Sequence, residues 1–305
     1  MPSKKSKPRS RFFISAHDDA GSARLHADTP QCRSASYKLA YQDVDFILRD
    51  ELRPVRLQLE LLKPELILQE NHIESTVVIF GSARILDPAT AEARLVSAEA
   101  ECRKHKNDDT LKQKVDSARR AMANSKYYDE ARKLGAFISS NTGKDKMVVI
   151  TGGGPGIMEA ANRGAILAGA PTIGFNITLP HEQEPNSWST PDLTFNFHYF
   201  AMRKMHLAMR ANGLCVFPGG FGTMDELFEI LTLVQTNKLD RFPVISMGGR
   251  DFWGQLGDFM RNTMLPAGVI SPQDVDFIHP AESPEEAIEF IQNSRIGTLS
   301  TSADS

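Results

Sequence analysis

Short apolar or β-branched runs recur along the chain, and stretches with helical spacing separate them. The predicted strands are residues 76–80, 147–150, 172–175, 193–197, 214–217, 242–247 and 276–278. Helices are predicted between them, for example at 223–236 and 252–264, and a last helix begins at Pro284 with Ser283 as its N-cap. This alternation predicts an α/β fold, a Rossmann-like open parallel sheet with helices on both faces.

The polar stretches divide the chain into regions. The predicted regions are a disordered basic tail (1–35), N-terminal helices packed on the core (36–74), a Rossmann-like nucleotide-binding domain (75–296) and a second disordered tail (297–305). Both tails are polar and lack an apolar period. Within the main domain, residues 88–140 are rich in Ala, Lys, Arg and Glu, which predicts a helical insertion with a break near 107–109.

Composition narrows the class of protein. The chain has 305 residues, a formal net charge of −3 and three cysteines, Cys32, Cys102 and Cys215. This net charge gives no general attraction to nucleic acid or to an anionic membrane. The cysteines are odd in number and far apart, which favours a reducing compartment over a disulfide framework. The sequence has no apolar run of transmembrane length and no signal-peptide core, so a cytoplasmic protein is predicted.

Glycine turns supply the candidate chemistry. The turn Pro218-Gly219-Gly220-Phe221-Gly222 joins a predicted strand to a predicted helix. Glycine lets backbone N–H groups approach a ligand closely, and the helix N-terminus behind the turn favours an anion such as phosphate. A second glycine turn at 152–156 and the pair Gly81-Ser82 follow two other strands. Because ligands bind at the carboxyl ends of the strands in such sheets, the three loops can line one crevice.

A nicotinamide dinucleotide is disfavoured as the ligand of these turns. Its fingerprint requires G-x-G-x-x-G and an acidic residue roughly 20 positions later. Counted from Gly152 the last glycine position holds Ile157, and counted from Gly154 it holds Glu159. The next predicted strand is followed by Asn176 rather than by an acidic residue.

Two motifs carry a family resemblance. Residues 218–226 resemble a PGGxGTxxE signature, and Arg203-Lys204 stand where the same family has an Arg-Lys pair. The family is Lonely Guy (LOG), the cytokinin-activating phosphoribohydrolases, whose members have carried the label lysine decarboxylase. The resemblance covers about residues 75–290. Phe200 stands where short members usually have Met, and the extra helical regions resemble the longer bacterial members.

The resemblance implies hydrolysis of the N-glycosidic bond of a nucleoside 5′-monophosphate, AMP or a cytokinin-type nucleotide, to free base and ribose 5-phosphate. It implies Glu226 and Arg203 as the catalytic pair. A carboxylate can stabilise the positive charge that builds on the sugar, or orient the attacking water, and the arginine can hold phosphate or assist the departing base. The implied substrate-binding residues are Gly81, Ser82, Gly152, Gly153, Gly154, Gly156, Met202, Lys204, Pro218, Gly219, Gly220, Gly222, Thr223, Asp225 and Glu229. No cofactor or metal is implied, and a homodimer or higher homo-oligomer is expected.

Several alternatives stay open. Thr223-x-x-Glu226 is also the pattern of a capping box, in which the glutamate only satisfies backbone donors. The protein could instead be a non-catalytic nucleotide-binding sensor or carrier of the same fold. The joint presence of Arg203 and Glu226 favours the enzyme, since a binder needs the glycines but not both of these residues. A structural role, in which residues 88–140 recruit a partner, is a third hypothesis.

Single residues carry further alternatives. Arg84 follows Gly81-Ser82 and could meet a phosphate or lie on an exposed loop. Pyridoxal chemistry is disfavoured because Lys204 is the one lysine near the predicted site. The histidines are scattered without the spacing of zinc ligands.

Overall fold

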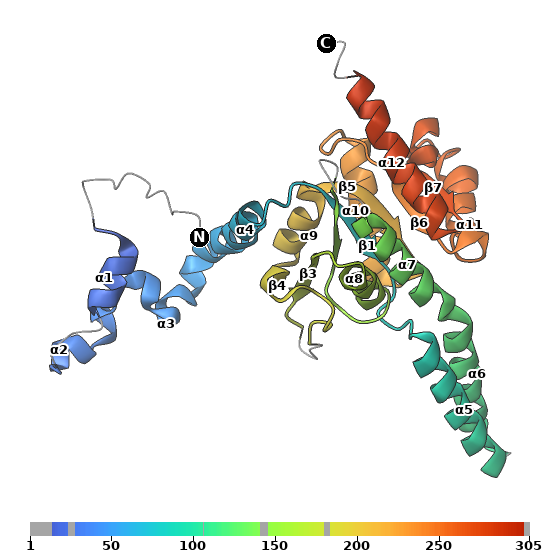
Figure 1. Cartoon of the computed structure of the whole chain (residues 1–305), viewed down its shortest axis with the longest axis horizontal. Helices are drawn as coiled ribbons and strands as arrows, with labels where there is room; N and C mark the ends of the chain where they lie inside the picture. Colours follow the sequence, from blue (N-terminus) through green and yellow to red (C-terminus); the bar gives the residue numbers. More distant parts are fainter. Residues whose placement is uncertain (1–13, 24–27, 106, 141–145, 180–183, 302–305) are drawn as a thin grey trace. The chain divides into compact units, whose positions relative to one another are not determined.

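The structure, a computed structural model, describes residues 14–23, 28–105, 107–140, 146–179 and 184–301 (Figure 1). It contains two compact units, Met1–Glu60 and Leu61–Ser305. In its described part, the first unit consists of short helices and turns. These are α1 (Ala16–Ser22), α2 (Pro30–Arg33), η2 (Ala35–Tyr37), η3 (Ala40–Gln42), α3 (Val44–Ile47), η4 (Asp50–Leu52) and the start of α4 (Arg53–Glu70).

The predicted N-terminal tail is partly helical. Ser15 caps α1 by accepting from the Asp18 N–H at 3.1 Å, and Thr29 caps α2 by accepting from the Cys32 N–H at 3.2 Å. The predicted disorder of residues 1–13 and 24–27 lies outside the described residues. The packing of the N-terminal helices on the core stays a prediction.

The second unit is built on one parallel sheet of seven strands, in the order β4-β3-β2-β1-β5-β6-β7. The strands are β1 (Thr76–Phe80), β2 (Val148–Thr151), β3 (Thr172–Ile177), β4 (Thr194–Phe197), β5 (Ala211–Val216), β6 (Val244–Met247) and β7 (Ile278–Ala281). The predicted α/β fold with an open parallel sheet is therefore confirmed.

Helices cover both faces of this sheet. The helices that follow β1 in this unit are α5 (Pro88–Lys104), α6 (Asp109–Asn124), α7 (Lys126–Ser140), α8 (Ile157–Leu167), α9 (Phe200–Met209), α10 (Phe221–Gln235), α11 (Gly249–Phe259) and α12 (Pro284–Thr301), with shorter segments η5 (Pro191–Leu193), η6 (Met260–Met264) and η7 (Pro272–Phe277). Alternate residues of each strand enter two separate cores, because successive side chains point to opposite faces. In β1, Val77 and Ile79 pack with α7, α8 and α12, whereas Val78 and Phe80 pack with α9 and α10.

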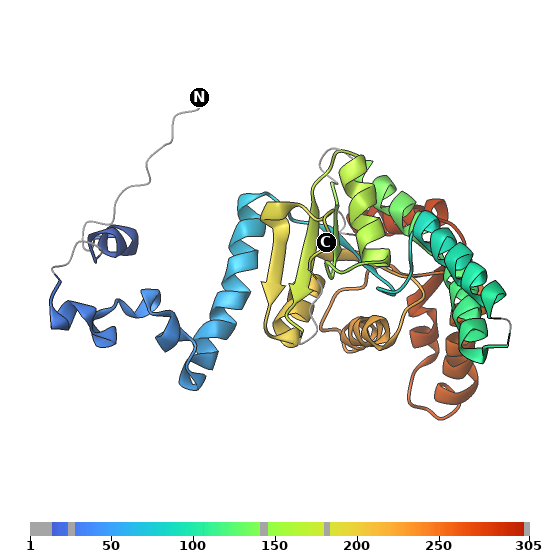
Figure 2. The same ribbon diagram turned by 90° about the horizontal axis from the view of Figure 1, so that it is seen from below.

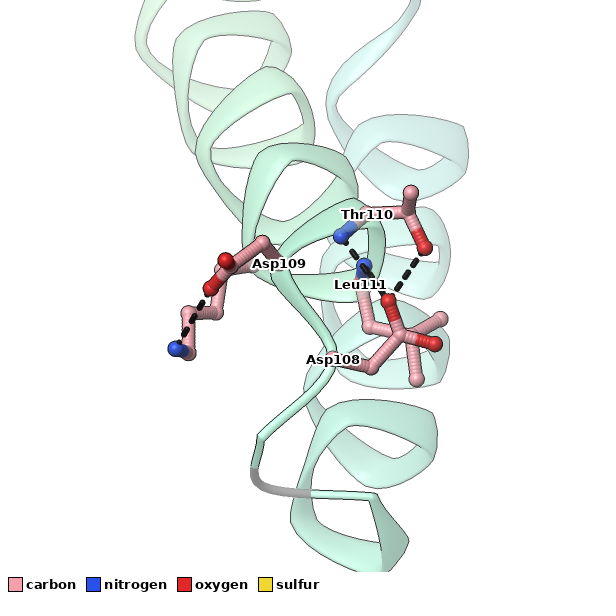
Figure 3. Close-up of polar contacts among 5 residues, drawn as sticks. Asp108, Asp109, Thr110 and Leu111 are labelled. Atoms are coloured by element: carbon pink, nitrogen blue, oxygen red, sulfur yellow. Dashed lines mark hydrogen bonds and ion pairs between the residues drawn. The ribbon is translucent and has the colours of Figure 1, made fainter.

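The helical insertion consists of α5, α6 and α7. In both views α5 and α6 lie side by side and extend away from the sheet (Figure 1, Figure 2). Asp108 begins α6: its carboxylate accepts from the Thr110 N–H at 2.9 Å, from the Leu111 N–H at 3.4 Å and from the Thr110 hydroxyl (Figure 3). Asp109 pairs with Lys112 at 2.8 Å in the same turn. These bonds satisfy free backbone donors of the first turn and set the break between α5 and α6.

The last helix begins as the sequence pattern predicts and ends later. The Ser283 hydroxyl accepts from the Glu286 N–H at 3.1 Å, so it caps α12, which starts at Pro284. The helix runs on to Thr301, into the region for which a tail is predicted, because extending an existing helix costs far less than starting one. Residues 302–305 lie outside the described residues. Within the described chain, no helix is both long enough and apolar enough to cross a membrane.

The strand order places a topological switch point between β1 and β5. From β1 the chain moves outward to β4 and then returns to β5 on the other side of β1. The loops that leave the two strands are joined: the Phe217 N–H donates to the Phe80 carbonyl at 2.8 Å, and the Ser82 N–H donates to the Pro218 carbonyl at 3.0 Å. A crevice at the carboxyl ends of such strands is the usual ligand site of this architecture.

Candidate functional site

A cavity of about 580 Å³ opens at this switch point. Its lining combines the loop after β1, the loop after β2, one side of α9 and the first turns of α10. The lining residues are Phe80, Gly81, Ser82, Ala83, Arg84, Gly152, Met158, Arg203, Gly220, Phe221, Gly222, Thr223 and Glu226. The volume is within the usual range for a small-molecule site.

The cavity brings together many of the residues predicted from the sequence. These are Gly81, Ser82, Gly152, Arg203, Gly220, Gly222, Thr223 and Glu226. Both candidate catalytic residues therefore line one cavity, with all three predicted loops. Phe80, Ala83, Met158 and Phe221 are additional lining residues that the sequence patterns did not single out. Arg84 lies on an exposed loop at the cavity, and its contact with a phosphate stays a prediction.

The other predicted residues are not part of the cavity lining. Among the described residues, its lining does not include Gly153, Gly154, Gly156, Met202, Lys204, Pro218, Gly219, Asp225 or Glu229. Gly153 and Gly156 have φ angles of +70° and +73°, which favour glycine. A Cβ on Gly153 would overlap the Asn176 side chain, and one on Gly219 would overlap the Thr223 side chain. These glycines serve the backbone path that shapes the site.

The amide side chains of Asn162, which is buried, and Asn186, which is half-buried, hold the second glycine turn, and the sequence patterns missed them. Asn162 accepts from the Thr151 hydroxyl at 2.8 Å and donates to the Thr172 hydroxyl at 2.6 Å. Asn186 donates to Asn162 at 3.0 Å and to the Gly154 carbonyl at 3.0 Å. Because buried amides are costly unless they are satisfied, this network fixes the turn in one conformation.

The N-terminus of α10 forms one wall of the cavity. The helix begins at Phe221, and Gly220 is its N-cap. In this position the backbone N–H groups of Phe221, Gly222 and Thr223 belong to the first turn, where a helix leaves its donors unpaired. Among the described residues, no heavy atom lies within 4 Å of a Cβ built on Gly220 or Gly222. The open space beside these donors suits an anion.

The capping-box alternative for Glu226 is wrong. A capping box requires Thr223 at the N-cap, but Thr223 is the third residue of α10 and Gly220 holds the cap position. The Glu226 carboxylate instead contacts Arg203, with Oε1 3.3 Å from Nη2. The Glu226 carboxylate therefore contacts a side chain of the cavity lining and does not cap the helix backbone.

Arg203 and Glu226 form a largely buried ion pair. The side chains are 14% and 5% exposed. Burial raises the pKa of Glu226 to about 7, although the positive charges of Arg203 and Lys204 oppose this rise. Burial likewise lowers the pKa of Arg203, against the attraction of Glu226. The Arg203 guanidinium also lies over the Phe200 ring, 5.1 Å from its centroid, so this aromatic side chain supports the cation.

A second group of charges lies beside this pair. The Lys204 ammonium is 2.7 Å from Asp225 Oδ2 and 2.6 Å from Glu229 Oε2. These three residues, predicted to hold substrate, contact one another in the structure. No cluster of three or more His, Cys, Asp or Glu side chains suited to a metal is found in the described part of the chain.

Fold and site together define a doubly wound α/β protein whose crevice is lined by the first turn of α10 and contains a buried Arg–Glu pair. The family model described as "Possible lysine decarboxylase" matches residues 158–291. Cytokinin riboside 5'-monophosphate phosphoribohydrolase LOG1 of Arabidopsis thaliana is 25% identical over 169 residues, which cover 55% of this chain and 76% of that protein. The resemblance to the LOG family is thus confirmed, at low sequence identity.

Two solved structures are similar to this chain at low TM-scores. The match to the X-ray structure of TM1055 covers 72% of this chain and 99% of the TM1055 chain, with 20% identity and a TM-score of 0.44. The Moco carrier protein from Chlamydomonas reinhardtii covers 72% of this chain and 96% of its own, with 20% identity and a TM-score of 0.41.

Proposed function

We propose that this protein hydrolyses the N-glycosidic bond of a nucleoside 5′-monophosphate, releasing the free base and ribose 5-phosphate. The observation that carries the proposal is the buried pair of Arg203 and Glu226, 3.3 Å apart in the lining of a cavity that also contains the N-terminus of α10. A site that only binds a nucleotide needs donors for the phosphate. A buried carboxylate beside those donors repels an anion, so its presence favours chemistry over storage.

The geometry of α10 suits a ligand with a phosphate at one end and a reacting carbon further along. We place the 5′-phosphate at the free N–H groups that begin at Phe221. Glu226 follows five residues later, a rise of about 7.5 Å along the helix axis. This rise is comparable with the separation of the phosphate and C1′ in a nucleoside 5′-monophosphate, so the carboxylate lies at the height of the glycosidic bond.

In the proposed reaction, the bond between C1′ and the base nitrogen breaks and its electron pair leaves with the base. Positive charge develops on the sugar ring, and the Glu226 carboxylate stabilises it. A water molecule oriented by the same carboxylate attacks C1′, and its proton passes to Glu226 and then to the departing base. A pKa of about 7 lets Glu226 accept and return this proton near neutral pH. Arg203 donates to the phosphate or to the base, and its charge favours the ionised form of Glu226.

The LOG1 relative is named as a cytokinin riboside 5'-monophosphate phosphoribohydrolase, and this name supports a nucleotide substrate here. The base is left to experiment: AMP and prenylated AMP are the first candidates. We also expect a homodimer or higher oligomer, which sedimentation equilibrium tests directly.

The test is release of free base from a panel of nucleoside 5′-monophosphates, followed by chromatography. We expect turnover by the unaltered protein, and a loss of roughly 10²–10⁴-fold in Glu226→Gln and in Arg203→Ala. Glu65→Gln serves as a matched control, because it removes a carboxylate that pairs with Arg210 at the far end of α9. Binding of nucleotides without release of base from any of them would instead establish a carrier or sensor.

A further inference from the structure

Two sets of ion pairs link α9 to α10 side by side. Arg203 of α9 contacts Glu226 of α10 at 3.3 Å, and the next residue, Lys204, contacts Asp225 and Glu229 at 2.7 and 2.6 Å. The Lys204 side chain is 14% exposed, whereas its partners Asp225 and Glu229 are 59% and 36% exposed. Asp225 and Glu229 flank Glu226 on the same helix, one residue before it and three residues after it.

We propose that Lys204 is a positioning residue, which binds Asp225 and Glu229 in order to keep their neighbour Glu226 in its carboxylate form and to hold α10 against α9. This inference rests on the proposed function of Glu226. It replaces the substrate-binding role predicted for Lys204, since Lys204 is outside the cavity lining and its ammonium contacts two carboxylates.

The balance of charge around Glu226 supports this role. The charged groups that face it are Arg203 and Lys204 from α9, Asp225 and Glu229 from α10, and Arg84, which lines the same cavity from the loop after β1. On α9 and α10, two positive charges stand against three negative charges. Without Lys204, a single arginine would face three carboxylates, and like charges disfavour the ionised form of a carboxyl group.

Lys204 remains charged in this setting. Burial acts to lower the pKa of Lys204, but its hydrogen bonds to Asp225 and Glu229 raise it above the ordinary value. Its charge is therefore constant over the pH range in which Glu226 titrates. Lys204 lowers the pKa of Glu226, whereas Glu229 and Asp225 raise it. The two kinds of substitution must consequently move the titration of Glu226 in opposite directions.

The experiment follows the Glu226 carboxyl carbon by NMR as a function of pH in ¹³C-glutamate-labelled protein. The Glu226→Gln variant identifies the resonance. We expect Lys204→Met to move the midpoint upward by roughly one pH unit, Glu229→Gln to move it downward, and Lys204→Arg to restore it. Glu65→Gln, which alters an ion pair at the other end of α9, is expected to leave the midpoint unchanged. The acid limb of kcat/KM, measured on the same proteins, should follow the same order.

The direction in which each substitution shifts the Glu226 titration midpoint tests the inference. If Lys204→Met and Glu229→Gln lower activity equally at every pH, and neither moves the Glu226 midpoint, the ion pairs only stabilise the fold and the inference fails. If Lys204→Met does not fold, the downward shift expected for Glu229→Gln still tests the inference, and an unchanged midpoint in that variant overturns it. Absence of base release by the unaltered protein counts against the proposed function, whereas the NMR titration tests Lys204 without relying on turnover.

Discussion

Replacing Glu226 by Gln should stabilise the protein at alkaline pH while abolishing its proposed activity. Glutamine has the shape of the protonated glutamate but cannot ionise. At pH 5 the native carboxyl group is mostly protonated, so the two proteins should have nearly the same free energy of unfolding. At pH 8 the carboxyl group is ionised, and the unaltered protein alone bears the cost of a buried charge.

The magnitude follows from the pKa of Glu226, which burial raises to about 7 from an ordinary value of 4.5. Between these two values the native state holds a proton that the unfolded chain has lost, so stability falls as the pH rises and the loss is complete above the native pKa. The difference of about 2.5 pKa units, at about 1.36 kcal/mol each, gives about 3 kcal/mol. The attraction of Arg203 is already contained in this pKa, so the loss of the ion pair requires no further correction.

The assay is urea unfolding of both proteins from pH 4.5 to 8.5, and the measured quantity is the difference in their free energies of unfolding. It should grow from near zero to about 3 kcal/mol in favour of Glu226→Gln. Glu65→Gln provides a control of opposite sign. Its hydrogen bond from Arg210 lowers the pKa of Glu65, so that carboxylate stabilises the fold above its unfolded pKa and loses this effect as the pH falls. A difference for Glu226→Gln that stays constant with pH, or that favours the unaltered protein at pH 8, would refute the reasoning.

Four further predictions test the site and its support. Because the proposed reaction needs ionised Glu226, kcat/KM should fall with decreasing pH through a midpoint near pH 7 in a pH–rate profile. Gly222→Ala should keep its melting temperature, because its Cβ meets open space within the described structure, but should weaken AMP binding roughly tenfold in calorimetry by entering the anion site. Gly153→Ala, at φ +70° against Asn176, should by contrast lower the melting temperature. In Gly164→Ala the new Cβ would overlap the Arg132 carbonyl of α7, and we expect a loss of about 1–3 kcal/mol in urea unfolding.

The strands were largely predictable because each carries a buried run of β-branched or apolar residues. The ends of the strands were harder to predict, because pairing with the neighbouring strands decides where each strand begins and ends. The predicted strand 214–217 begins earlier in the structure. β5 starts at Ala211, which pairs with Thr76 of β1, and it therefore includes the polar residue Asn212. The predicted strand 276–278 lies instead at Ile278–Ala281, because a 3₁₀ turn occupies the residues before it. That strand contains Pro280, which an edge position tolerates and which sequence preference disfavours.

The glycine motifs located the site, yet the sequence could not say which glycines face a ligand. Gly222 faces open space and Gly219 packs on Thr223, although both stand in one short motif. The difference arises from the turn conformation, which residue spacing does not encode. The contacts of Lys204 could not be predicted from the sequence either, because Asp225 and Glu229 are more than 20 residues away along the chain. The contacts depend on how α9 packs against α10. From the sequence alone, Lys204 was therefore predicted to bind substrate, whereas in the structure it contacts two carboxylates.

The arrangement of charge supports an enzyme more strongly than any single residue does. Burial of an ion pair is weak as a source of stability, because desolvation offsets most of the attraction between the charges. At Glu226 burial outweighs the attraction of Arg203 and Lys204, since the pKa is raised and not lowered. A carrier would gain stability by replacing this glutamate with an uncharged residue, and it would gain affinity by removing a negative charge beside the phosphate. A fold that keeps an unfavourable carboxylate at its switch point, 3.3 Å from an arginine, is more readily understood if the carboxylate acts on a bond. A gain in stability and a loss of base release in the same Glu226→Gln protein would establish that trade-off directly.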